Sequence, residues 1–446
     1  MFESVLIANR GEIARRVIRT AQRMGLRAIA VYSEADAKAP YVREADDALL
    51  LGPASPAESY LDMDRVLEAA ATAGAGAVHP GYGFLAENSE FARRVVDAGL
   101  VWVGPAPSAI ERMGDKINAR NLMADVGVPV SPGSREPIVS VEAAVAEARR
   151  IGYPVMVKAA AGGGGIGMAV ARDEVTLRPA FEGARSRAAR FFGDSGVLLE
   201  RYIEGARHVE VQILGLADGR VVALGERDCS VQRRHQKVAE ETPSPGVSPG
   251  LRARMLDAAA RAGEAIEYRG AGTVECLVAP AEQDFVFIEM NTRLQVEHPI
   301  TELVTGIDLV EQQLLIASGE EISFDPTAAP PRGHALELRI YAEDPRRFLP
   351  SPGEITAWRE PSGDGVRVDA GYDAGDMVTP YYDPLLAKLC VHGEDRVEAL
   401  ERARAAVASF RIEGPKTNLP FFDELLGDAE FVGGDYDTGL VDRMRG

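Results

Sequence analysis

Residues 289–298 carry more kinds of reactive side chain than any other stretch of the chain. They follow residues 285–288, a short apolar run that is typical of a β-strand. Side chains alternate between the two faces of a strand, so an extended chain would direct every second residue the same way. One face would then present Glu289, Asn291, Arg293, Gln295 and Glu297. The other face would present Met290, Leu294 and Val296.

These five polar side chains have the chemistry of a site for a metal ion and an anion. Carboxylate and Asn oxygens suit a hard cation such as Mg²⁺, and a guanidinium beside an amide suits a small planar oxyanion. A metal next to an oxyanion indicates phosphoryl or acyl-phosphate chemistry. The alternative is an ordinary sheet edge whose polar side chains face solvent. Strict alternation of five functional residues favours the reactive site.

A second candidate is the strand-like run at residues 155–158, which ends in Lys158 and precedes a glycine-rich segment at 162–167. Glycines allow backbone N–H groups to approach phosphate oxygens closely, because no Cβ intervenes. Lys158 would add a point charge to the same phosphates. The glycines alone fit a ligand-free hairpin loop equally well, and the preceding lysine favours phosphate binding.

A third candidate is the cationic segment at residues 227–237, which ends Arg233-Arg234-His235-Gln236-Lys237. Such a segment stands out in a chain whose formal net charge is −19. Taken alone, it fits a solvated charged strand as well as a functional one. The chain has only six lysines among 49 basic residues, so a lysine at position 237 suggests a need for a compact ammonium group.

Arg339 lies in the run 336–340, where Glu337 and Arg339 alternate with apolar residues. This alternation predicts a strand with an apolar face toward the core and a polar face that holds both charges. A permanently charged guanidinium suits a developing oxyanion. From these residues alone, a structural ion pair with Glu337 is the favoured interpretation.

Length and charge bound what the protein can be. Its 446 residues allow roughly two to four domains around a large core. With 68 acidic against 49 basic residues, it lacks the basic surplus of a nucleic-acid-binding protein. Three cysteines without a CxxC pair argue against a disulfide scaffold or a zinc site and predict a reducing compartment, the cytoplasm. We expect no signal peptide and no membrane span.

The first third alternates strand-like and helix-like patterns, which predicts an α/β unit with a parallel sheet. The expected strands are at residues 5–8, 28–32, 75–78 and 100–103, with a helix at 13–24. The turn at residues 9–12 lacks the dinucleotide-binding fingerprint, and no P-loop motif occurs. The turn-rich motif at residues 79–83 is interpreted as structural. Loops or linkers are expected at residues 129–137, 241–250 and 328–333.

Together these motifs resemble the biotin carboxylase family of the ATP-grasp superfamily. The resemblance runs from Leu6-Ile7-Ala8-Asn9-Arg10-Gly11-Glu12-Ile13-Ala14 to Tyr381-Tyr382-Asp383-Pro384-Leu385-Leu386-Ala387-Lys388-Leu389, and residues 289–299 are its most specific part. It implies an α/β ATP-grasp fold with three domains. These are a Rossmann-like N-terminal domain at 1–113, an ATP-grasp domain at 114–330 with a mobile lid at about 131–203, and a C-terminal domain at 331–446.

The resemblance also implies a reaction in which ATP and bicarbonate form carboxyphosphate, which then carboxylates N1′ of biotin. Glu297 is implied as the base that deprotonates bicarbonate, Arg339 as the group that stabilises the biotin enolate, and Lys237 and Arg293 as further catalytic residues. The implied bicarbonate site is Arg293, Gln295 and the backbone of Val296. The implied ligands of Mg²⁺ or Mn²⁺ are Glu275, Glu289 and Asn291. The implied ATP contacts are Lys116, Lys158, Gly163, Gly164, Gly165, Met168, Glu200, Arg201, Ile203, His208, Gln232, His235 and Leu277.

The family's biotin-bearing lysine is flanked by methionines, and none of the six lysines here has a Met neighbour. We therefore expect biotin to arrive on a separate biotin carboxyl carrier protein. A carboxyltransferase is the second expected partner, and a homodimer is the implied state. Acetyl-CoA carboxylase is the favoured assembly, and propionyl-CoA and pyruvate carboxylases are alternatives. Ala161 and Ile166 depart from the commonest family lid motif. Two further hypotheses are another ATP-grasp ligase, in which an amine captures an acyl phosphate, and a catalytically silent subunit.

Overall fold

The N-terminal part of the chain forms a five-stranded parallel sheet, as its alternating pattern predicts. The computed structural model describes residues 1–159, 168–192, 196–325 and 331–445. The strand order is β3-β2-β1-β4-β5. The bounds are β1 Ser4–Ile7, β2 Arg27–Ser33, β3 Asp47–Gly52, β4 Ala77–His79 and β5 Val101–Trp102. Strand β3 was not predicted, because it lies at an edge of the sheet and its residues show no regular alternation of buried and exposed positions.

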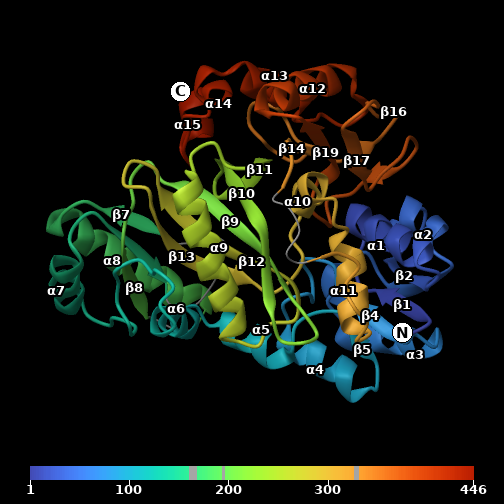
Figure 1. Cartoon of the computed structure of the whole chain (residues 1–446), viewed down its shortest axis with the longest axis horizontal. Coiled ribbons are helices and arrows are strands. Elements are labelled where there is room, and N and C mark those ends of the chain that lie inside the picture. Colours follow the sequence, from blue (N-terminus) through green and yellow to red (C-terminus); the bar gives the residue numbers. More distant parts are fainter. Residues whose placement is uncertain (160–167, 193–195, 326–330, 446) are drawn as a thin grey trace.

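Helices cover both faces of this sheet (Figure 1). One face packs against α1 (Gly11–Arg23), α2 (Pro40–Glu44) and α11 (Leu309–Ala317). The other packs against α3 (Met63–Thr72), α4 (Ser89–Asp97) and α5 (Pro107–Gly114). Short 3₁₀ turns occupy η1 (Glu34–Asp36) and η2 (Pro56–Glu58). The motif at residues 79–83 is held as a turn, because Asn9 Nδ2 donates to the carbonyls of Pro80 and Tyr82 at 2.7 Å each.

The centre of the molecule is an eight-stranded sheet in the order β13-β12-β9-β10-β11-β14-β19-β17. The bounds are β9 Arg207–Gly215, β10 Val221–Arg233, β11 Gln236–Thr242, β12 Gly270–Ala279, β13 Asp284–Asn291, β14 His334–Tyr341, β17 Val366–Ala370 and β19 Leu385–Gly393. Helices α9 (Pro249–Glu264) and α6 (Lys116–Asp125) pack against its first half. The loop expected at 241–250 is shorter than predicted. Strand β11 continues through Thr242, and α9 begins at Pro249 behind a Ser248 cap.

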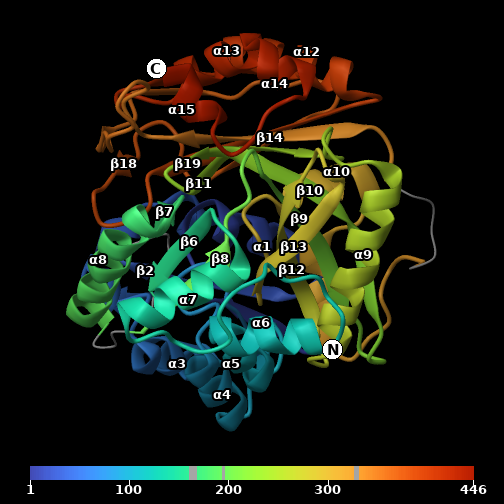
Figure 2. The same cartoon turned by 90° about the vertical axis from the view of Figure 1, so that its left-hand side faces the viewer.

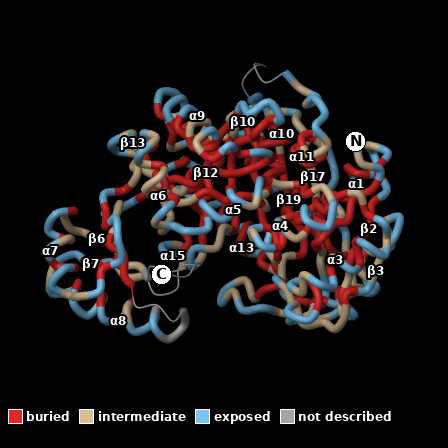
Figure 3. Tube along the Cα trace, turned by 90° about the horizontal axis from the view of Figure 1, so that it is seen from below, coloured by how far each residue is buried: buried red, intermediate tan, exposed pale blue. Residues whose placement is uncertain are grey.

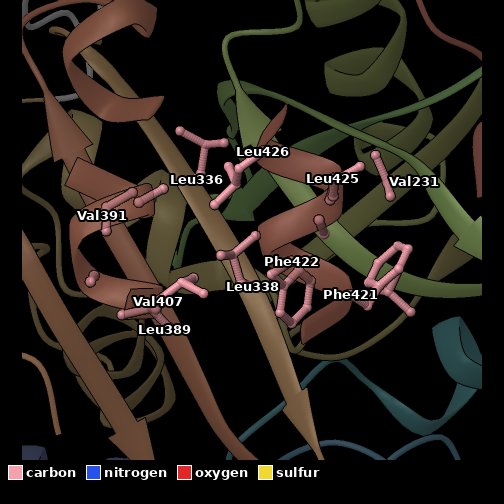
Figure 4. Close-up of a cluster of buried hydrophobic side chains, with 14 of the residues drawn as sticks. Val231, Leu336, Leu338, Leu389, Val391, Val407, Phe421, Phe422, Leu425 and Leu426 are labelled. Atoms are coloured by element: carbon pink, nitrogen blue, oxygen red, sulfur yellow. The ribbon is translucent and has the colours of Figure 1, made fainter. Parts of the chain in front are cut away.

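The long sheet continues through the chain region where a domain boundary is expected, since β11 pairs directly with β14 in antiparallel register. Beyond that point, α12 (Arg396–Ser409) and α13 (Leu419–Gly427) bury an apolar cluster against β14 and β19 (Figure 4). Leu336 and Leu338 of β14 point into this cluster, as the run at 336–340 predicts. The remaining elements are α10 His298–Thr305, α14 Ala429–Gly433, α15 Leu440–Arg445, β15 Gly353–Glu354, β16 Ala357–Arg359, β18 Met377–Val378 and β20 Arg411–Glu413.

Residues 138–201 build a separate small layer with its own apolar core, which we call the lid. Its elements are α7 Val141–Ile151, β6 Val155–Ala159, β7 Ala169–Ala171, α8 Glu174–Phe192 and β8 Val197–Arg201. Viewed from below, the lid stands apart from the buried residues that concentrate along the long sheet (Figure 3). Among the described helices, none is long and apolar enough to cross a bilayer.

Candidate active site

The β10–β11 hairpin carries the cationic segment into the long sheet. Its turn residues, Arg234 and His235, have φ values of 50° and 66°, the left-handed conformation that a tight two-residue hairpin turn requires. The hairpin sets Lys237 opposite Gln232. Residues 227–232 are buried, so the alternative of a solvated charged strand is wrong for this part of the segment.

Lys237 lies at the centre of three carboxylates from three other elements. Its Nζ lies 2.5 Å from Glu210 Oε2, 2.6 Å from Glu297 Oε1 and 3.0 Å from Glu275 Oε1. Burial alone would lower the pKa of Lys237, but the acidic neighbours raise this pKa well above its ordinary value. The ammonium group is therefore charged at neutral pH.

Glu297 lies at the N-cap position of α10 and is fully buried. Arg339 Nη2 lies 3.0 Å from its Oε2, while Lys237 holds its Oε1. Burial alone would raise the pKa of Glu297, but Lys237, Arg339 and Arg227 together hold the pKa well below its usual range. The side chain is thus an ionised carboxylate with a cation on each oxygen.

Arg339 is buried, and its ion pairs differ from the one expected from sequence. Its Nη2 lies 2.6 Å from Glu240 Oε1 and 3.0 Å from Glu297 Oε2. Glu337 instead lies beside Cys390, whose Sγ is 3.4 Å from Glu337 Oε2. The expected pair with Glu337 is therefore wrong, because the neighbouring strand β11 and the start of α10 supply closer carboxylates to the guanidinium.

The extended conformation expected for residues 289–297 is also wrong in its second half. Strand β13 ends at Asn291, and the chain turns before α10 begins. The turn is fixed by Glu87, which accepts hydrogen bonds from Thr292 N at 3.1 Å and Arg293 Nε at 2.8 Å. The polar side chains still converge, because the turn folds them back toward the strands.

Arg293 and Gln295 form a polar rim next to Glu297. Arg293 donates to Gln295 Oε1 at 3.0 Å and to Asn291 Oδ1 at 3.1 Å. The carbonyl of Val296 accepts from Lys388 Nζ at 2.9 Å, and Lys388 in turn pairs with Glu12 at 3.1 Å. A guanidinium, an amide and a fixed loop thus stand beside the carboxylate, an arrangement suited to a small oxyanion.

The three predicted metal ligands come from adjacent strands. Glu275 and Glu289 are directly opposed in the β12–β13 register, and Asn291 Nδ2 donates to Glu275 Oε1 at 2.8 Å. Lys116 Nζ lies 3.0 Å from Glu289 Oε2. Two opposed carboxylates and an amide oxygen form a donor set that suits Mg²⁺. The predicted ligands therefore fit a divalent cation.

His208 and Glu210 extend this donor set beyond the prediction. Atoms of His208, Glu210 and Glu275 lie within 4.8 Å of one another, and Gln232 Nε2 lies 2.6 Å from His208 Nδ1. His208, Gln232 and the metal-ligand candidates are thus brought together. His235 is not, since it lies exposed at the hairpin turn without a hydrogen-bond or ion-pair partner among the described residues.

Of the remaining predicted nucleotide contacts that the structure describes, Leu277 lies on β12, and the others lie on the lid or in residues 202–203 that follow it. Lys158 on β6 forms an ion pair with Glu200 on the neighbouring β8. The Arg201 side chain turns toward the lid, where Nη1 donates to the carbonyl of Ile151 at 3.3 Å. Met168, Ile203 and Leu277 are half-buried. Gly163, Gly164 and Gly165 lie outside the described residues, as do Ala161 and Ile166.

Several charged residues of the site were missed by sequence reasoning: Glu210, Glu240 and Glu12 are buried, and Glu87 is exposed. Glu210 is fully buried and also lies 2.6 Å from Arg227. Its strand shows a signal that would have found it, since His208, Glu210 and Gln212 alternate with apolar residues. Glu240, Glu87 and Glu12 carry no such pattern. Only the tertiary fold brings them to Arg339, Arg293 and Lys388.

Models of three domain families match consecutive parts of the chain. "Biotin carboxylase, N-terminal domain" matches residues 1–110, "Carbamoyl-phosphate synthase L chain, ATP binding domain" matches 115–324, and "Biotin carboxylase C-terminal domain" matches 337–443. Together these three models cover nearly the whole chain.

Known proteins match the chain over its full length. A biotin carboxylase of Halalkalibacterium halodurans is 52% identical over 99% of this chain and 97% of its own. A pyruvate carboxylase subunit of Methanothermobacter thermautotrophicus is 48% identical over 100% of this chain and 90% of its own. The solved biotin carboxylase of Campylobacter jejuni, in complex with an ATP analogue, superposes with a TM-score of 0.96 at 44% identity over 99% of both chains. The biotin carboxylase domain dimer of Hydrogenobacter thermophilus 2-oxoglutarate carboxylase, with MgADP and bicarbonate, gives 0.94 at 42% identity over 99% and 98% of the two chains.

Proposed function

The chain belongs to the biotin carboxylase family of ATP-grasp enzymes, and from that membership we propose the steps and partners of its reaction. The reaction is the ATP-dependent carboxylation of biotin with bicarbonate. We assign its parts to an N-terminal domain at 1–113, an ATP-grasp domain at 114–330 with the lid, and a C-terminal domain at 331–446. The observation that carries the proposal is Glu297, a buried carboxylate held by Lys237 and Arg339 beside the Arg293–Gln295 rim.

Glu297 is the base of the first step. Bicarbonate binds against Arg293, Gln295 and the backbone of Val296, and it gives its proton to Glu297. Its oxygen then attacks the γ-phosphorus of ATP, the bond from that phosphorus to the β–γ bridging oxygen breaks, and ADP leaves. The product is carboxyphosphate, whose carboxyl carbon passes to N1′ of biotin as phosphate departs.

The two cations on Glu297 set its basicity. In the resting state they hold its pKa far below the ordinary value, which makes it a weak proton acceptor. Lys237 is also in reach of the phosphate groups, and Arg339 of the biotin ureido oxygen. When substrates recruit these two cations, Glu297 loses their stabilisation and becomes more basic. The base is therefore strengthened when the nucleotide recruits Lys237, and strengthened further when biotin recruits Arg339.

The nucleotide is held by groups from the body and the lid. Lys116, Lys158 and Lys237 contact its phosphates, the hinge residues Glu200 to Ile203 with Met168 and Leu277 contact the adenine, and His208, Gln232 and His235 contact the nucleoside or phosphates. Glu275, Glu289 and Asn291 would hold Mg²⁺, or Mn²⁺ in its place. The cation would neutralise phosphate charge during phosphoryl transfer. Lys116 and Lys237, which now pair with these carboxylates, would then turn toward the phosphates.

Arg339 acts at the second step. The phosphate released from carboxyphosphate takes the N1′ proton of biotin, which places negative charge on the ureido oxygen, and a fixed guanidinium stabilises that charge. Glu240 also pairs with Arg339, through the same Nη2 atom that contacts Glu297. It therefore keeps the guanidinium in place when the contact with Glu297 opens.

The expected partners follow from the absence of a lysine flanked by Met, the residue that carries biotin in this family. Biotin arrives on a biotin carboxyl carrier protein, and a carboxyltransferase subunit passes the carboxyl group to the final acceptor. We propose acetyl-CoA as the first acceptor to test, with propionyl-CoA and pyruvate as alternatives, since the relatives include subunits of a pyruvate carboxylase and of an acyl-CoA carboxylase. We further propose a cytoplasmic homodimer, with the three buried cysteines as free thiols.

An ATPase assay with four mixtures tests this proposal: no addition, bicarbonate, free biotin, and both. We expect ATP cleavage to need bicarbonate and to rise with biotin. Cleavage that needs an amine instead would identify a different ATP-grasp ligase. Binding of magnesium-ATP without any turnover in the four mixtures would identify a silent subunit.

A further inference from the structure

A cavity of about 470 Å³ lies at the hinge between the lid and the body, outside the site described above. Three arginines from three segments line it: Arg120 from α6, Arg135 from the segment that leads to the lid, and Arg150 from α7. Helices α6 and α7 lie next to each other in the view of Figure 2, with β8 behind them. The cavity therefore borders both rigid parts of the molecule.

The cavity carries unbalanced positive charge. Among the described residues that line it, Glu147 is the only carboxylate, and it is engaged by Arg150 at 2.6 Å. The Arg135 guanidinium has no hydrogen-bond or ion-pair partner in the described parts of the chain. Burial lowers the pKa of Arg120. Glu200 raises this pKa, while the positive charges of Arg135 and Arg150 lower it further. Three guanidinium groups, of which Arg135 and Arg150 are exposed and Arg120 is half-buried, thus share one lining carboxylate in a chain of net charge −19.

A purely structural role explains only part of this cluster. Arg120 donates to the carbonyls of Ser134 at 2.8 Å and Ser131 at 2.6 Å, and Arg150 donates to that of Gly133 at 3.1 Å. These bonds hold residues 131–134, which lead from the body to the lid, in place. They leave Arg120 Nε buried without a partner among the described residues, and they do not account for Arg135.

We propose that this cavity binds a small phosphorylated organic molecule. Guanidinium groups match phosphate oxygens geometrically, and groups from three segments suit a tetrahedral anion better than a planar carboxylate. The cavity falls within the size range of small-molecule sites and exceeds the needs of phosphate alone. Ala124, Val130 and Pro132 provide an apolar wall for the organic part.

Such a ligand would act on nucleotide binding through the hinge. The backbone at Gly133 is the wall between the cavity and the Lys158–Glu200 ion pair: a Cβ at this position would lie 3.0 Å from Arg120 Nη2 and 3.0 Å from Glu200 Cγ. A phosphate that contacts α6 and α7 together favours one position of the lid over others. Its affinity is then coupled to that of the nucleotide, and the coupling acts equally in both directions.

Calorimetric titration of the full chain tests the proposal without any use of turnover. The probes are glycerol 3-phosphate, inorganic phosphate, and glycerol as the matched uncharged control, each added to protein saturated with magnesium and a non-hydrolysable ATP analogue. The double variant Arg135→Gln/Arg150→Gln removes two of the three cations. Arg149→Gln is the control, because Arg149 is exposed on α7 as Arg150 is, does not line the cavity, and pairs with Glu174 at 2.7 Å.

We expect glycerol 3-phosphate to bind the wild type and the control equally, and the double variant at least roughly tenfold more weakly. If inorganic phosphate binds as tightly as glycerol 3-phosphate, the cavity recognises the phosphate group alone. If glycerol 3-phosphate binds more tightly, the apolar wall contributes to its affinity. Unchanged affinity in the double variant, binding of glycerol itself, or no heat with about 10 mM ester would overturn the proposal. Melting temperatures of both variants show whether they remain folded.

Discussion

Arg339 Nη2 lies 3.0 Å from Glu297 Oε2 and joins strand β14 to the start of α10. The two residues are 42 positions apart in sequence. Lys237 holds the other oxygen of the same carboxylate at 2.6 Å. A buried carboxylate with a cation on each oxygen, which we propose as the base, is therefore the central relationship of the site.

Replacement of that base gives the first prediction. Glu297→Gln keeps the shape of the side chain but cannot accept a proton, so we expect kcat to fall about 10²–10⁴-fold, the usual range for loss of a general base. Bicarbonate-dependent ATP cleavage measures the fall. Affinity for the ATP analogue should stay close to that of the wild type and serves as the internal control. Near-normal turnover would remove Glu297 from the mechanism.

Arg339 should separate the two steps. Arg339→Gln removes the guanidinium that faces biotin, and we expect carboxylation of a biotinylated carrier to fall by roughly 10²-fold or more. ATP cleavage with bicarbonate alone should fall far less, because Arg339 takes no part in the attack of bicarbonate on ATP. Arg359→Gln, at an exposed position on β16, is the matched control. Equal losses in both assays would contradict a role confined to biotin.

Glu240 predicts a pH dependence of stability. Burial raises the pKa of Glu240 to about 7, and Arg339 opposes this rise. The folded state thus keeps a proton that the unfolded state loses near its ordinary pKa, so this residue's contribution is full below about pH 4.5 and is lost as pH rises through 7. Relative to Glu240→Gln, the wild type should lose up to about 3 kcal/mol of unfolding free energy across that window. Urea denaturation at a series of pH values measures the difference, and parallel curves would contradict it.

Arg227 should be a major structural contributor. Its guanidinium is fully buried and lies 2.6 Å from Glu210, so Arg227→Met leaves a carboxylate without one of its two cations. We expect a loss of about 3–5 kcal/mol in unfolding free energy. Arg220→Met breaks an exposed pair with Asp218 and should cost under about 1 kcal/mol. Equal losses for the two variants, measured by urea denaturation, would show that burial of the pair is irrelevant.

The division of labour between chains gives the last prediction. Mass spectrometry of protein from biotin-replete cells should show a chain without biotin, because no lysine has a neighbouring Met. Labelled bicarbonate with magnesium-ATP should transfer label to a purified biotinylated carrier. Free biotin should be a much poorer acceptor, since it lacks the carrier's binding energy. Biotin found on Lys388 or Lys416 would refute this division.

The parts of the site that could be predicted from the sequence are those whose residues lie close together along the chain. Residues 289–297, the Lys158 strand and the cationic segment each combine unusual side chains within a few positions, and the structure brings most of them together. The parallel N-terminal sheet was likewise predicted from strand–helix alternation. Edge strand β3 was missed because burial does not impose a regular pattern on it.

The remaining contacts depend on distant segments. Glu87 fixes the turn at Thr292 and Arg293, and Lys388 fixes the carbonyl of Val296. Neither residue has a local signal for such a role, because its partner is brought near only by tertiary packing. The chain therefore turns after Asn291, where periodicity alone predicted a continuing strand.

The direct pairing of β11 with β14 has a consequence for truncation. A chain that ended before His334 would leave residues 239–242 of β11 as an open edge, with backbone N–H and C=O groups that β14 now satisfies. Open edges of this kind recruit strands from other molecules and promote aggregation. The exposed strand would be the one that carries Lys237. The C-terminal quarter is thus also a protective cover, and the first three quarters are expected to be insoluble alone.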